Sequence, residues 1–242
     1  MYKIYVSPSL QPRNKYVVEP YNEQGVMHSL GDLVIAKLFR HRDKFEVGVN
    51  NTGMNLLEAI EASNRFKADI HLALHTNADE DPDTEGTEVY HHEGSVDGKR
   101  LAEILYKHVA PISPGKDRGV KSDKVLYSTG LAELRETICP AALLEAIYHT
   151  NRIETKDLLK RQEAYAEGIY KAVCEYFDVE PLEQEVSTFP DIDCHPLEKD
   201  IIEATKLGLV NGYQDGLFRP NSHITRAEVT SLILRLYNKL TI

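Results

Sequence analysis

The pattern of apolar and polar positions predicts strands alternating with helices over the first three quarters of the chain. Predicted strands lie at Tyr2–Val6, Phe45–Val49, Asp69–His75, Thr87–His91, Val125–Ser128 and Ala141–Tyr148. Apolar residues recur at helical spacing in Asn22–Arg40, Leu56–Phe66, Leu101–Val109 and Glu154–Phe177. Strands that alternate with helices predict an α/β fold, a doubly wound and mostly parallel sheet with helices on both faces.

Three chemically active segments are expected at one edge of this sheet. The carboxyl ends of parallel strands share an edge, and ligand sites form there. The loop after Val6, His75 and Glu145 all reach it, because each follows or ends a predicted strand. Glu145 stands inside the apolar run Ala141–Tyr148, where a buried carboxylate without a partner is costly. A metal, a cation or a catalytic role is therefore expected at Glu145.

The periodic pattern stops after Phe177. Residues 178–188 are acidic, proline-interrupted and aperiodic, which predicts a linker. Residues 189–242 then carry two helical patterns, Pro196–Leu207 and Arg226–Asn238, around a turn-rich middle, and Thr225 with Glu228 predicts a capping box. We therefore expect a catalytic domain at 1–177, a linker at 178–188 and a small α-helical module at 189–242.

Composition narrows the class of protein. The 242 residues carry a formal charge of -10, which disfavours nucleic-acid binding because a basic surface is needed for that. No apolar run approaches the roughly 20 residues that span a bilayer. The cysteines Cys139, Cys174 and Cys194 lack metal-ligand spacing, so unpaired thiols are expected. No basic and apolar leader precedes Tyr2–Val6, which predicts a cytoplasmic chain until lysis or a holin releases it, unless a leader has been removed.

The residues at the predicted edge suit a zinc hydrolase. Such an enzyme needs about three protein ligands, an open position for water and a carboxylate that moves the water's proton. Glu23 and His75 are the expected ligands, Gln11 and His149 are further candidates, and Glu145 is the acid/base group. His28 is a weaker alternative on the first helix. His71 lies roughly 13 Å along the strand from His75, so we expect a structural role for it.

Four segments of residues 1–177 resemble the zinc-dependent N-acetylmuramoyl-L-alanine amidases. They are Asn22-Glu-Gln24; Asp69-Ile-His-Leu-Ala-Leu-His-Thr-Asn-Ala78 with Gly86-Thr-Glu-Val-Tyr90; Asp117-Arg-Gly-Val-Lys121; and Leu134-Arg-Glu-Thr-Ile-Cys-Pro-Ala-Ala-Leu-Leu-Glu145 with His149-Thr-Asn151. The resemblance implies hydrolysis of the amide between N-acetylmuramic acid and L-alanine in peptidoglycan. It implies Glu23 and His75 as Zn²⁺ ligands, Glu145 as general base and then acid, and substrate contacts for Asn77. For Arg118, a turn-stabilising and a substrate-binding role both stay open.

The first loop departs from that family. Its members open with Asp-Pro-Gly-His, whose histidine binds zinc, whereas this chain has Ser7-Pro-Ser-Leu-Gln11. Gln11 would be a poorer ligand than an imidazole, and His149 is the other candidate for the vacant role. A non-catalytic wall-binding protein with a degenerate metal site is therefore the alternative hypothesis, and an endopeptidase on the same fold is a third.

Residues 189–228 resemble a single S-layer-homology module. The similarity lies in Phe189-Pro-Asp-Ile192, in Leu207-Gly-Leu-Val-Asn-Gly-Tyr-Gln-Asp-Gly-Leu-Phe-Arg-Pro-Asn221 and in Ile224-Thr-Arg-Ala-Glu228. It implies binding to a secondary cell-wall polysaccharide, with Arg226 on an acidic pyruvyl group. Such modules usually occur in threes, so self-association through this single repeat and a purely auxiliary role both stay open. Together the two resemblances imply a wall-lytic enzyme, either an endolysin of phage type or a wall-turnover autolysin.

Overall fold

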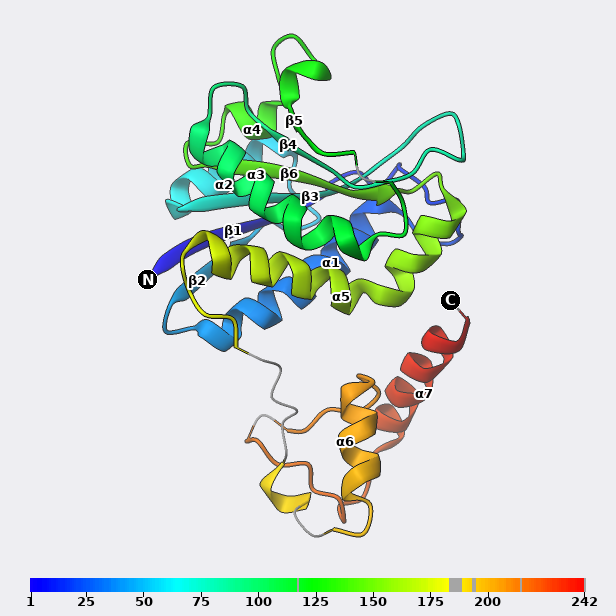
Figure 1. The fold of residues 1–242 in the computed structure, drawn as a ribbon. Coiled ribbons are helices and arrows are strands. Elements are labelled where there is room, and N and C mark those ends of the chain that lie inside the picture. The colour runs from blue at the N-terminus through cyan, green and yellow to red at the C-terminus, as the bar shows by residue number, and fades with distance from the viewer. Residues whose placement is uncertain (117, 183–188, 193–194, 214, 242) are drawn as a thin grey trace. The chain divides into compact units, whose positions relative to one another are not determined.

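The computed structural model in Figure 1 describes residues 1–116, 118–182, 189–192, 195–213 and 215–241. Contacts divide the chain into two units, Met1–Pro181 and Leu182–Ile242, which we describe separately. Most of the expected linker, residues 183–188, lies outside the described residues, as do Asp117 and Cys194.

The first unit is built on a six-stranded sheet with strand order β2-β1-β3-β6-β4-β5. Its strands are β1 (Tyr2–Pro8), β2 (Phe45–Val49), β3 (Ile70–Asn77), β4 (Glu88–His91), β5 (Val120–Ser122) and β6 (Ala141–Tyr148). All neighbouring pairs are parallel except β4 with β6. The expected α/β fold with a mostly parallel sheet is therefore confirmed, with β4 and β5 running opposite to the other four strands.

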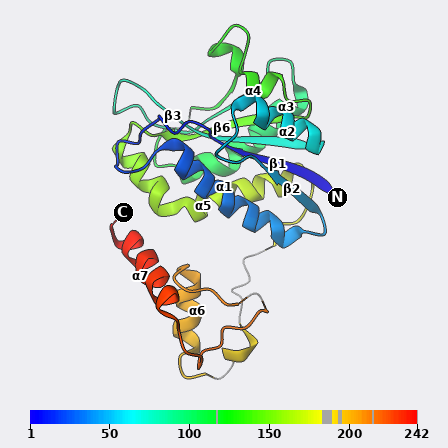
Figure 2. The same cartoon turned by 180° about the vertical axis from the view of Figure 1, so that it is seen from behind.

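Helices cover both faces of this sheet. They are α1 (Glu23–Leu38), α2 (Leu56–Phe66), α3 (Val96–Val109), α4 (Ala132–Arg135) and α5 (Arg152–Tyr176), with short 3-10 helices at η1 (Phe39–His41), η2 (Ala110–Ile112) and η3 (Asp123–Val125). α5 contacts both α1 and α3 on one face, and α2 and α4 contact each other on the opposite face, which Figure 2 shows from behind.

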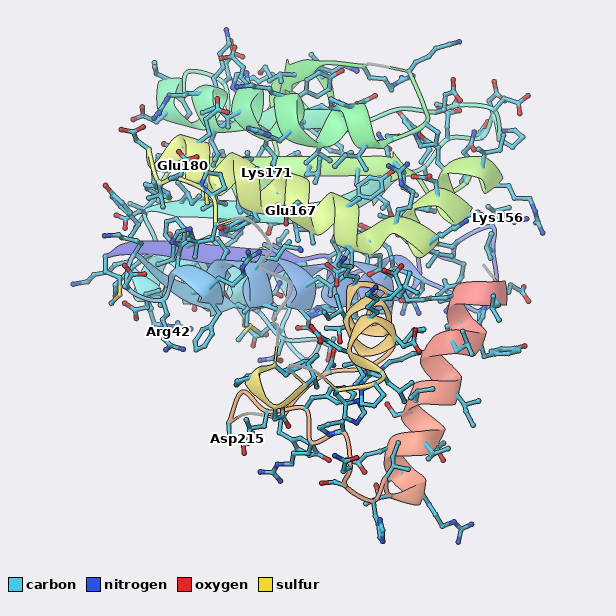
Figure 3. The ribbon with its side chains drawn as sticks, turned by 60° about the horizontal axis from the view of Figure 1, so that its bottom comes forward. Arg42, Lys156, Glu167, Lys171, Glu180 and Asp215 are labelled. Atoms are coloured by element: carbon cyan, nitrogen blue, oxygen red, sulfur yellow. The ribbon has the colours of Figure 1, made fainter. Side chains whose placement is uncertain are left out.

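Side chains alternate between these two layers. Leu72 and Leu74 of β3 are fully buried on one side, while Ala73 packs with Leu134 of α4 on the other. Lys37 of α1 pairs with Glu163 and Glu167 of α5 at 3.1 and 3.2 Å. In Figure 3, Glu167 and Lys171 follow one side of α5, and their charged groups lie 3.8 Å apart.

One sequence prediction in this unit is wrong. Residues 125–128 do not form a strand, because the chain turns through η3 immediately after β5. The buried carboxylate of Asp123 accepts hydrogen bonds from the backbone N–H groups of Glu93 and Leu131, and this fixes the turn. Val125 and Tyr127 are 65% and 61% exposed, so the apolar pattern there does not mark a buried strand.

The second unit is small and helical. It contains η4 (Pro190–Ile192), α6 (Glu198–Lys206) and α7 (Arg226–Thr241). A core cluster joins Phe189, Ile192 and Ile201. The predicted capping box at the start of α7 is confirmed: the Thr225 N–H donates to Glu228 Oε2 at 2.7 Å, and the Glu228 N–H donates to Thr225 Oγ1 at 3.2 Å.

Two further expectations from the sequence concern membrane spans and thiols. Within the described residues, no helix has the length and apolar character that crossing a bilayer would require. Cys139 and Cys174 are both free thiols, half-buried and buried respectively.

Candidate active site

His75 lies at the centre of a polar cluster near the carboxyl end of β3. Its Nδ1 is 2.9 Å from Oε1 of Glu23, the first residue of α1, and its Nε2 is 3.5 Å from Oε2 of Glu133 in α4. Asn22 caps α1 by accepting a hydrogen bond from the Gly25 N–H at 2.9 Å. The helix start therefore holds Glu23 against the end of β3.

The loop after β1 brings two amides to the same place. The Nε2 of Gln11 lies 3.4 Å from Nδ1 of His75. The side-chain amide of Asn14 donates to Gln11 Oε1 at 2.9 Å and to Glu23 Oε2 at 2.6 Å. Gln11, a candidate from the sequence, thus lies beside both expected ligands, and Asn14 bridges it to Glu23.

Glu145 faces this cluster from the next strand. It is the register partner of His75 in the β3–β6 pair, and it is partly buried. Its Oε2 is buried and has no hydrogen-bond partner among the described residues. Burial raises the pKa of Glu145 to about 8; the charge of His75 opposes that rise, whereas Glu23, Glu88 and Glu133 add to it.

The other charged groups of the cluster shift in the direction that keeps them ionised. Burial alone would raise the pKa of Glu23 and of Glu133, but hydrogen bonds outweigh it and both pKa values are lowered. Burial likewise opposes protonation of His75, yet its hydrogen bonds with Glu133 and Glu23 raise its pKa well above the usual value. Without a metal, these contacts favour the protonated imidazole between the two carboxylates.

Glu133 is the member of the cluster that sequence reasoning missed. Its Oε1 accepts a hydrogen bond from Ser7 Oγ at 2.6 Å and lies 3.0 Å from Nε2 of His71. His71 and His75 thus share one carboxylate although a long stretch of strand separates them. Glu133 lies just before the segment Leu134–Glu145 that resembles the amidase family, so the motif does not include it, and only its approach to β3 in the folded chain reveals the contact.

His149 is close to the cluster, but its hydrogen bonds go elsewhere. The ring is buried, its Nδ1 is 3.1 Å from both Oγ1 and the carbonyl oxygen of Thr76, and it stacks on Tyr16 with centroids 5.4 Å apart. Burial lowers the pKa of His149, so its neutral form is favoured. Asn77 ends β3, is half-buried and caps the Ala78 N–H through Oδ1 at 2.8 Å.

Arg118 lies on the other side of Glu145. Its Nε donates to the buried carboxylate of Glu88, the register partner of Glu145 across β4 and β6. Tyr148 donates to the same Glu88 at 2.8 Å, and Lys121 pairs with it at 3.2 Å. Burial alone would raise the pKa of Glu88, but the hydrogen bond from Tyr90, together with these donors, lowers it to about 2. Arg118 is about one third exposed, so it both fixes Glu88 and faces solvent near Glu145.

The donor types in this cluster fit zinc. Within the described residues, no group of three or more His, Cys, Asp and Glu side chains has the geometry to hold a metal. Near Nδ1 of His75 lie the carboxylate of Glu23 and the carboxamide of Gln11. One imidazole, one carboxylate and one carboxamide therefore meet at this point. Zinc accepts an imidazole nitrogen and a carboxylate oxygen, and the oxygen of a carboxamide is a poorer ligand. The unpartnered carboxylate of Glu145 is placed to serve a water beside them.

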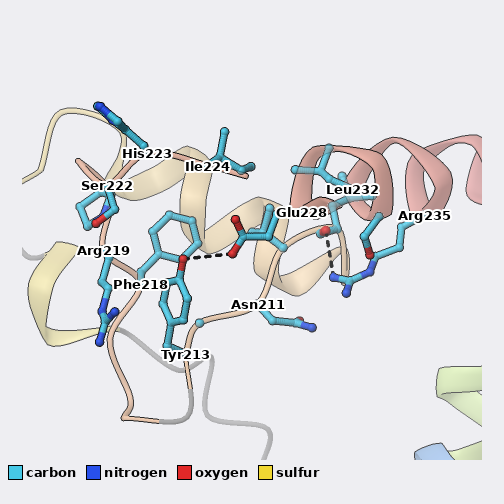
Figure 4. Close-up of a pocket in the computed structure, with 15 residues that line it drawn as sticks. Asn211, Tyr213, Phe218, Arg219, Ser222, His223, Ile224, Glu228, Leu232 and Arg235 are labelled. Carbon is cyan, nitrogen blue, oxygen red and sulfur yellow. Dashed lines mark hydrogen bonds between the residues drawn. The ribbon is translucent and has the colours of Figure 1, made fainter. Parts of the chain in front are cut away.

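The second unit has a groove of about 540 Å³, drawn in Figure 4. Tyr213, Phe218, Arg219 and Arg235 are among its lining residues. The Tyr213 hydroxyl donates to Glu228 at 3.2 Å, and Arg235 donates to the carbonyl of Leu209 at 3.3 Å. Arg226, the glycan-binding candidate from the sequence, is exposed at the start of α7 and does not line this groove.

Comparisons with known proteins agree with this division of the chain. A family described as N-acetylmuramoyl-L-alanine amidase matches residues 14–175, and the S-layer homology domain matches residues 188–230. The amidase LytC of Bacillus subtilis (strain 168) is 26% identical over 126 residues, 51% of this chain and 24% of its own length. An uncharacterised cell wall amidase of Bacillus anthracis is 28% identical over 148 residues, 57% of this chain and 26% of its own length. The chain thus spans about a quarter of these curated relatives.

Solved structures share the fold of the first unit. The catalytic domain of CwlV, an N-acetylmuramoyl-L-alanine amidase from Bacillus (Paenibacillus) polymyxa var. colistinus, is 23% identical with a TM-score of 0.67, and the match covers 74% of this chain and all of that one. The N-acetylmuramoyl-L-alanine amidase of Clostridium difficile 630 is 23% identical with a TM-score of 0.66, covering 73% of this chain and 97% of that one. Since the amidase family matches well over half of its residues, the chain belongs to the N-acetylmuramoyl-L-alanine amidase family and carries an S-layer homology domain at its C-terminal end.

Proposed function

We propose that this protein is a peptidoglycan hydrolase that cleaves the amide between N-acetylmuramic acid and L-alanine. The observation that carries the proposal is the position of the unpartnered Glu145 carboxylate opposite His75 and Glu23. An acid/base carboxylate beside two metal-binding side chains is what hydrolysis of an unactivated amide requires. Family membership of residues 14–175 supports this bond as the target.

We propose that the site works with Zn²⁺, held by Glu23 Oε1, His75 Nδ1 and the amide oxygen of Gln11. These atoms belong to side chains that already contact one another. When bound, the ion would polarise the scissile carbonyl and lower the pKa of a water. Asn14 donates to Glu23 Oε2 and so leaves Oε1 facing His75. Gln11 is proposed over His149 because its amide already contacts His75, whereas Nδ1 of His149 is directed to Thr76. Oε1 of Gln11 accepts from Asn14 and its Nε2 faces His75, so this role requires the amide to turn over when the ion binds.

Glu145 takes the proton of the attacking water and returns it to the departing L-alanine amine. Its raised pKa of about 8 makes it a good proton donor once it is protonated, and a neighbouring dication would favour its ionised form before attack. Arg118 neutralises Glu88, whose charge would otherwise stand beside Glu145. Asn77 at the end of β3 and the exposed side of Arg118 are proposed substrate contacts.

The second unit is proposed to hold the enzyme at the bacterial cell wall. The S-layer homology match over residues 188–230 supports binding to a secondary cell-wall polysaccharide. Arg226 is exposed and carries a guanidinium fork that suits a glycan carboxylate. Binding of this kind would raise the local concentration of the first unit on its insoluble substrate.

Digestion of purified cell walls tests this proposal. The wild-type protein is expected to release muropeptides with new L-alanine amino termini, identified by labelling of amino groups and by mass spectrometry. Glu145→Gln should abolish that release, because the amide cannot take a proton from water. Glu93→Gln, at an exposed glutamate away from the cluster, is the matched control and should digest walls normally.

Each competing function gives a different outcome. Walls that bind the protein without new amino groups would favour a non-catalytic wall binder, especially if elemental analysis finds no zinc after reconstitution. Walls that break down with new amino termini inside the stem peptide would favour an endopeptidase. Loss of activity on chelation, with recovery on zinc addition, is expected for the proposed amidase.

A further inference from the structure

The two ring nitrogens of His75 face different carboxylates. Nδ1 lies 2.9 Å from Oε1 of Glu23 and 3.4 Å from Nε2 of Gln11. Nε2 of His75 lies 3.5 Å from Oε2 of Glu133. Because the nitrogens lie on different sides of the ring, an ion bound at one of them leaves the other to its own partner. The group that contacts Nε2 therefore decides whether Nδ1 carries a proton or a free lone pair.

Glu133 is itself held by several elements. Glu133 is 6% exposed. Its Oε1 accepts a hydrogen bond from Ser7 Oγ of β1 at 2.6 Å and lies 3.0 Å from Nε2 of His71. The other ring nitrogen of His71 is 2.9 Å from Ser63 Oγ of α2, and the ring stacks on Tyr5 with centroids 5.5 Å apart. Oε1 is thus fully engaged, and Oε2 is the atom left for His75.

We propose that Glu133 is a positioning residue that accepts the Nε2–H of His75 and thereby presents Nδ1, as a lone pair, to the metal between Glu23 and Gln11. This inference rests on the proposed zinc hydrolase and adds a residue that no ligand motif contains. Glu133 is not itself a ligand in this arrangement, because the imidazole ring stands between it and Glu23. A carboxylate behind a metal-bound histidine fixes the tautomer and raises the basicity of the ligand.

The variant Glu133→Gln tests the inference, because it keeps the size of the side chain and removes its charge. Zinc affinity is measured by competition with a chelator of known strength, and a loss of about 10- to 100-fold is expected. Glu136→Gln is the matched control, since Glu136 lies three residues on, is exposed and pairs with Arg135. Its zinc affinity should equal that of the wild type.

A second measurement starts from the wild-type protein, so its main result does not require a variant that folds well. Nitrogen-15 spectra of histidine-labelled, zinc-loaded wild-type protein report which ring nitrogen of His75 carries the proton. We expect a protonated Nε2 and a metal-bound Nδ1, with the Nε2–H signal moved in Glu133→Gln. A purely structural role for Glu133 would lower the melting temperature of that variant but leave zinc affinity and the Nε2–H signal unchanged.

The outcomes separate this inference from the proposed function. Zinc on Nε2 of His75, or equal zinc affinity in wild type and Glu133→Gln, would overturn the role of Glu133 while wall digestion by the wild type still stood. A wild-type protein that digests walls yet takes up no zinc would overturn the metal and Glu133 together. A wild-type protein that takes up zinc with the expected signals but digests no wall would support Glu133 and refute the proposed amidase.

Discussion

His75 and Glu145 stand directly opposite each other on the neighbouring parallel strands β3 and β6. An imidazole and an unpartnered carboxyl group are thus held at one edge of the sheet by backbone register, not by a bond between the two side chains. Glu23 and Glu133 take the hydrogen bonds of the imidazole, and Glu145 keeps a buried oxygen free. Burial raises the pKa of Glu145 to about 8, although the neighbouring charge of His75 opposes that rise.

Glu145→Gln should change how stability depends on pH in the metal-free protein. The folded-state pKa of Glu145 is raised from 4.5 to about 8, so the folded protein binds more protons than the unfolded chain between these values. Stability therefore falls as pH rises through that window, by up to about 1.4 kcal/mol per pH unit. Glu145→Gln should lose this part of the slope and gain stability relative to wild type as pH increases.

Urea unfolding of both proteins at a series of pH values between 4.5 and 8 measures the effect. Glu93→Gln, at an exposed position, should keep the wild-type slope. Parallel profiles for the wild type and Glu145→Gln would show that the carboxylate is solvated and that its burial is not the controlling factor.

Gln11 controls zinc affinity if its amide is the third ligand. Gln11→Ala removes the donor and should weaken zinc binding by roughly tenfold or more, and Gln11→His should strengthen it, because imidazole is the better zinc ligand. Competition with a chelator measures both changes. Pro12, next in the same exposed loop, offers Pro12→Ala as a control with unchanged affinity. Equal affinities in all four proteins would remove Gln11 from the ligand set.

Gly86 is required where the chain enters β4 beside Glu88. Its φ is +116°, and a Cβ there would overlap the backbone carbonyl oxygen of Lys116. Gly86→Ala should therefore cost about 2–3 kcal/mol of unfolding free energy. Gly94 has a φ of +81° but open space around it, so Gly94→Ala should cost only about 1 kcal/mol. Thermal unfolding of the two variants compares them, and equal losses would contradict the role of the overlap.

Arg226 is expected to carry the affinity of the second unit for wall polysaccharide. Arg226→Gln should reduce co-sedimentation with polysaccharide-bearing walls, most clearly at low salt, where an exposed ion pair is least screened. Arg235→Gln changes a groove-lining arginine of the same unit and is the matched comparison. Loss of binding in Arg235→Gln, with Arg226→Gln unaffected, would move the glycan site from the start of α7 into the groove.

The elements themselves could mostly be predicted from local pattern. The strands at Phe45–Val49 and Ala141–Tyr148 begin and end where their apolar runs do. The pattern failed at 125–128, where three consecutive apolar residues follow a turn held by the Asp123 carboxylate. The hydrogen bonds that the backbone N–H groups of Glu93 and Leu131 donate to Asp123 fix the turn, and the local pattern of apolar residues carries no sign of them.

The site divides in the same way. Topology predicted that the loop after β1, His75 and Glu145 would reach one edge of the sheet. The role of Glu23 was expected from the resemblance of its segment to the amidase family. The structure brings these residues together. The contact of Gln11 with His75 and the engagement of His149 with Thr76 could not be predicted, because both depend on side-chain direction within loops and strand ends.

By itself, the sequence determined most of the strands and helices, though not β5 or α4, and the edge of the sheet that would collect polar groups, because these follow from periodicity and strand polarity. Only the tertiary structure decided that Glu133 joins Ser7, His71 and His75. These residues come from α4, β1 and β3, and a carboxylate can satisfy partners far apart in sequence once packing brings α4 against the sheet. Burial then sets their charges, since desolvation depends on everything that surrounds a group and not on its neighbours in the chain.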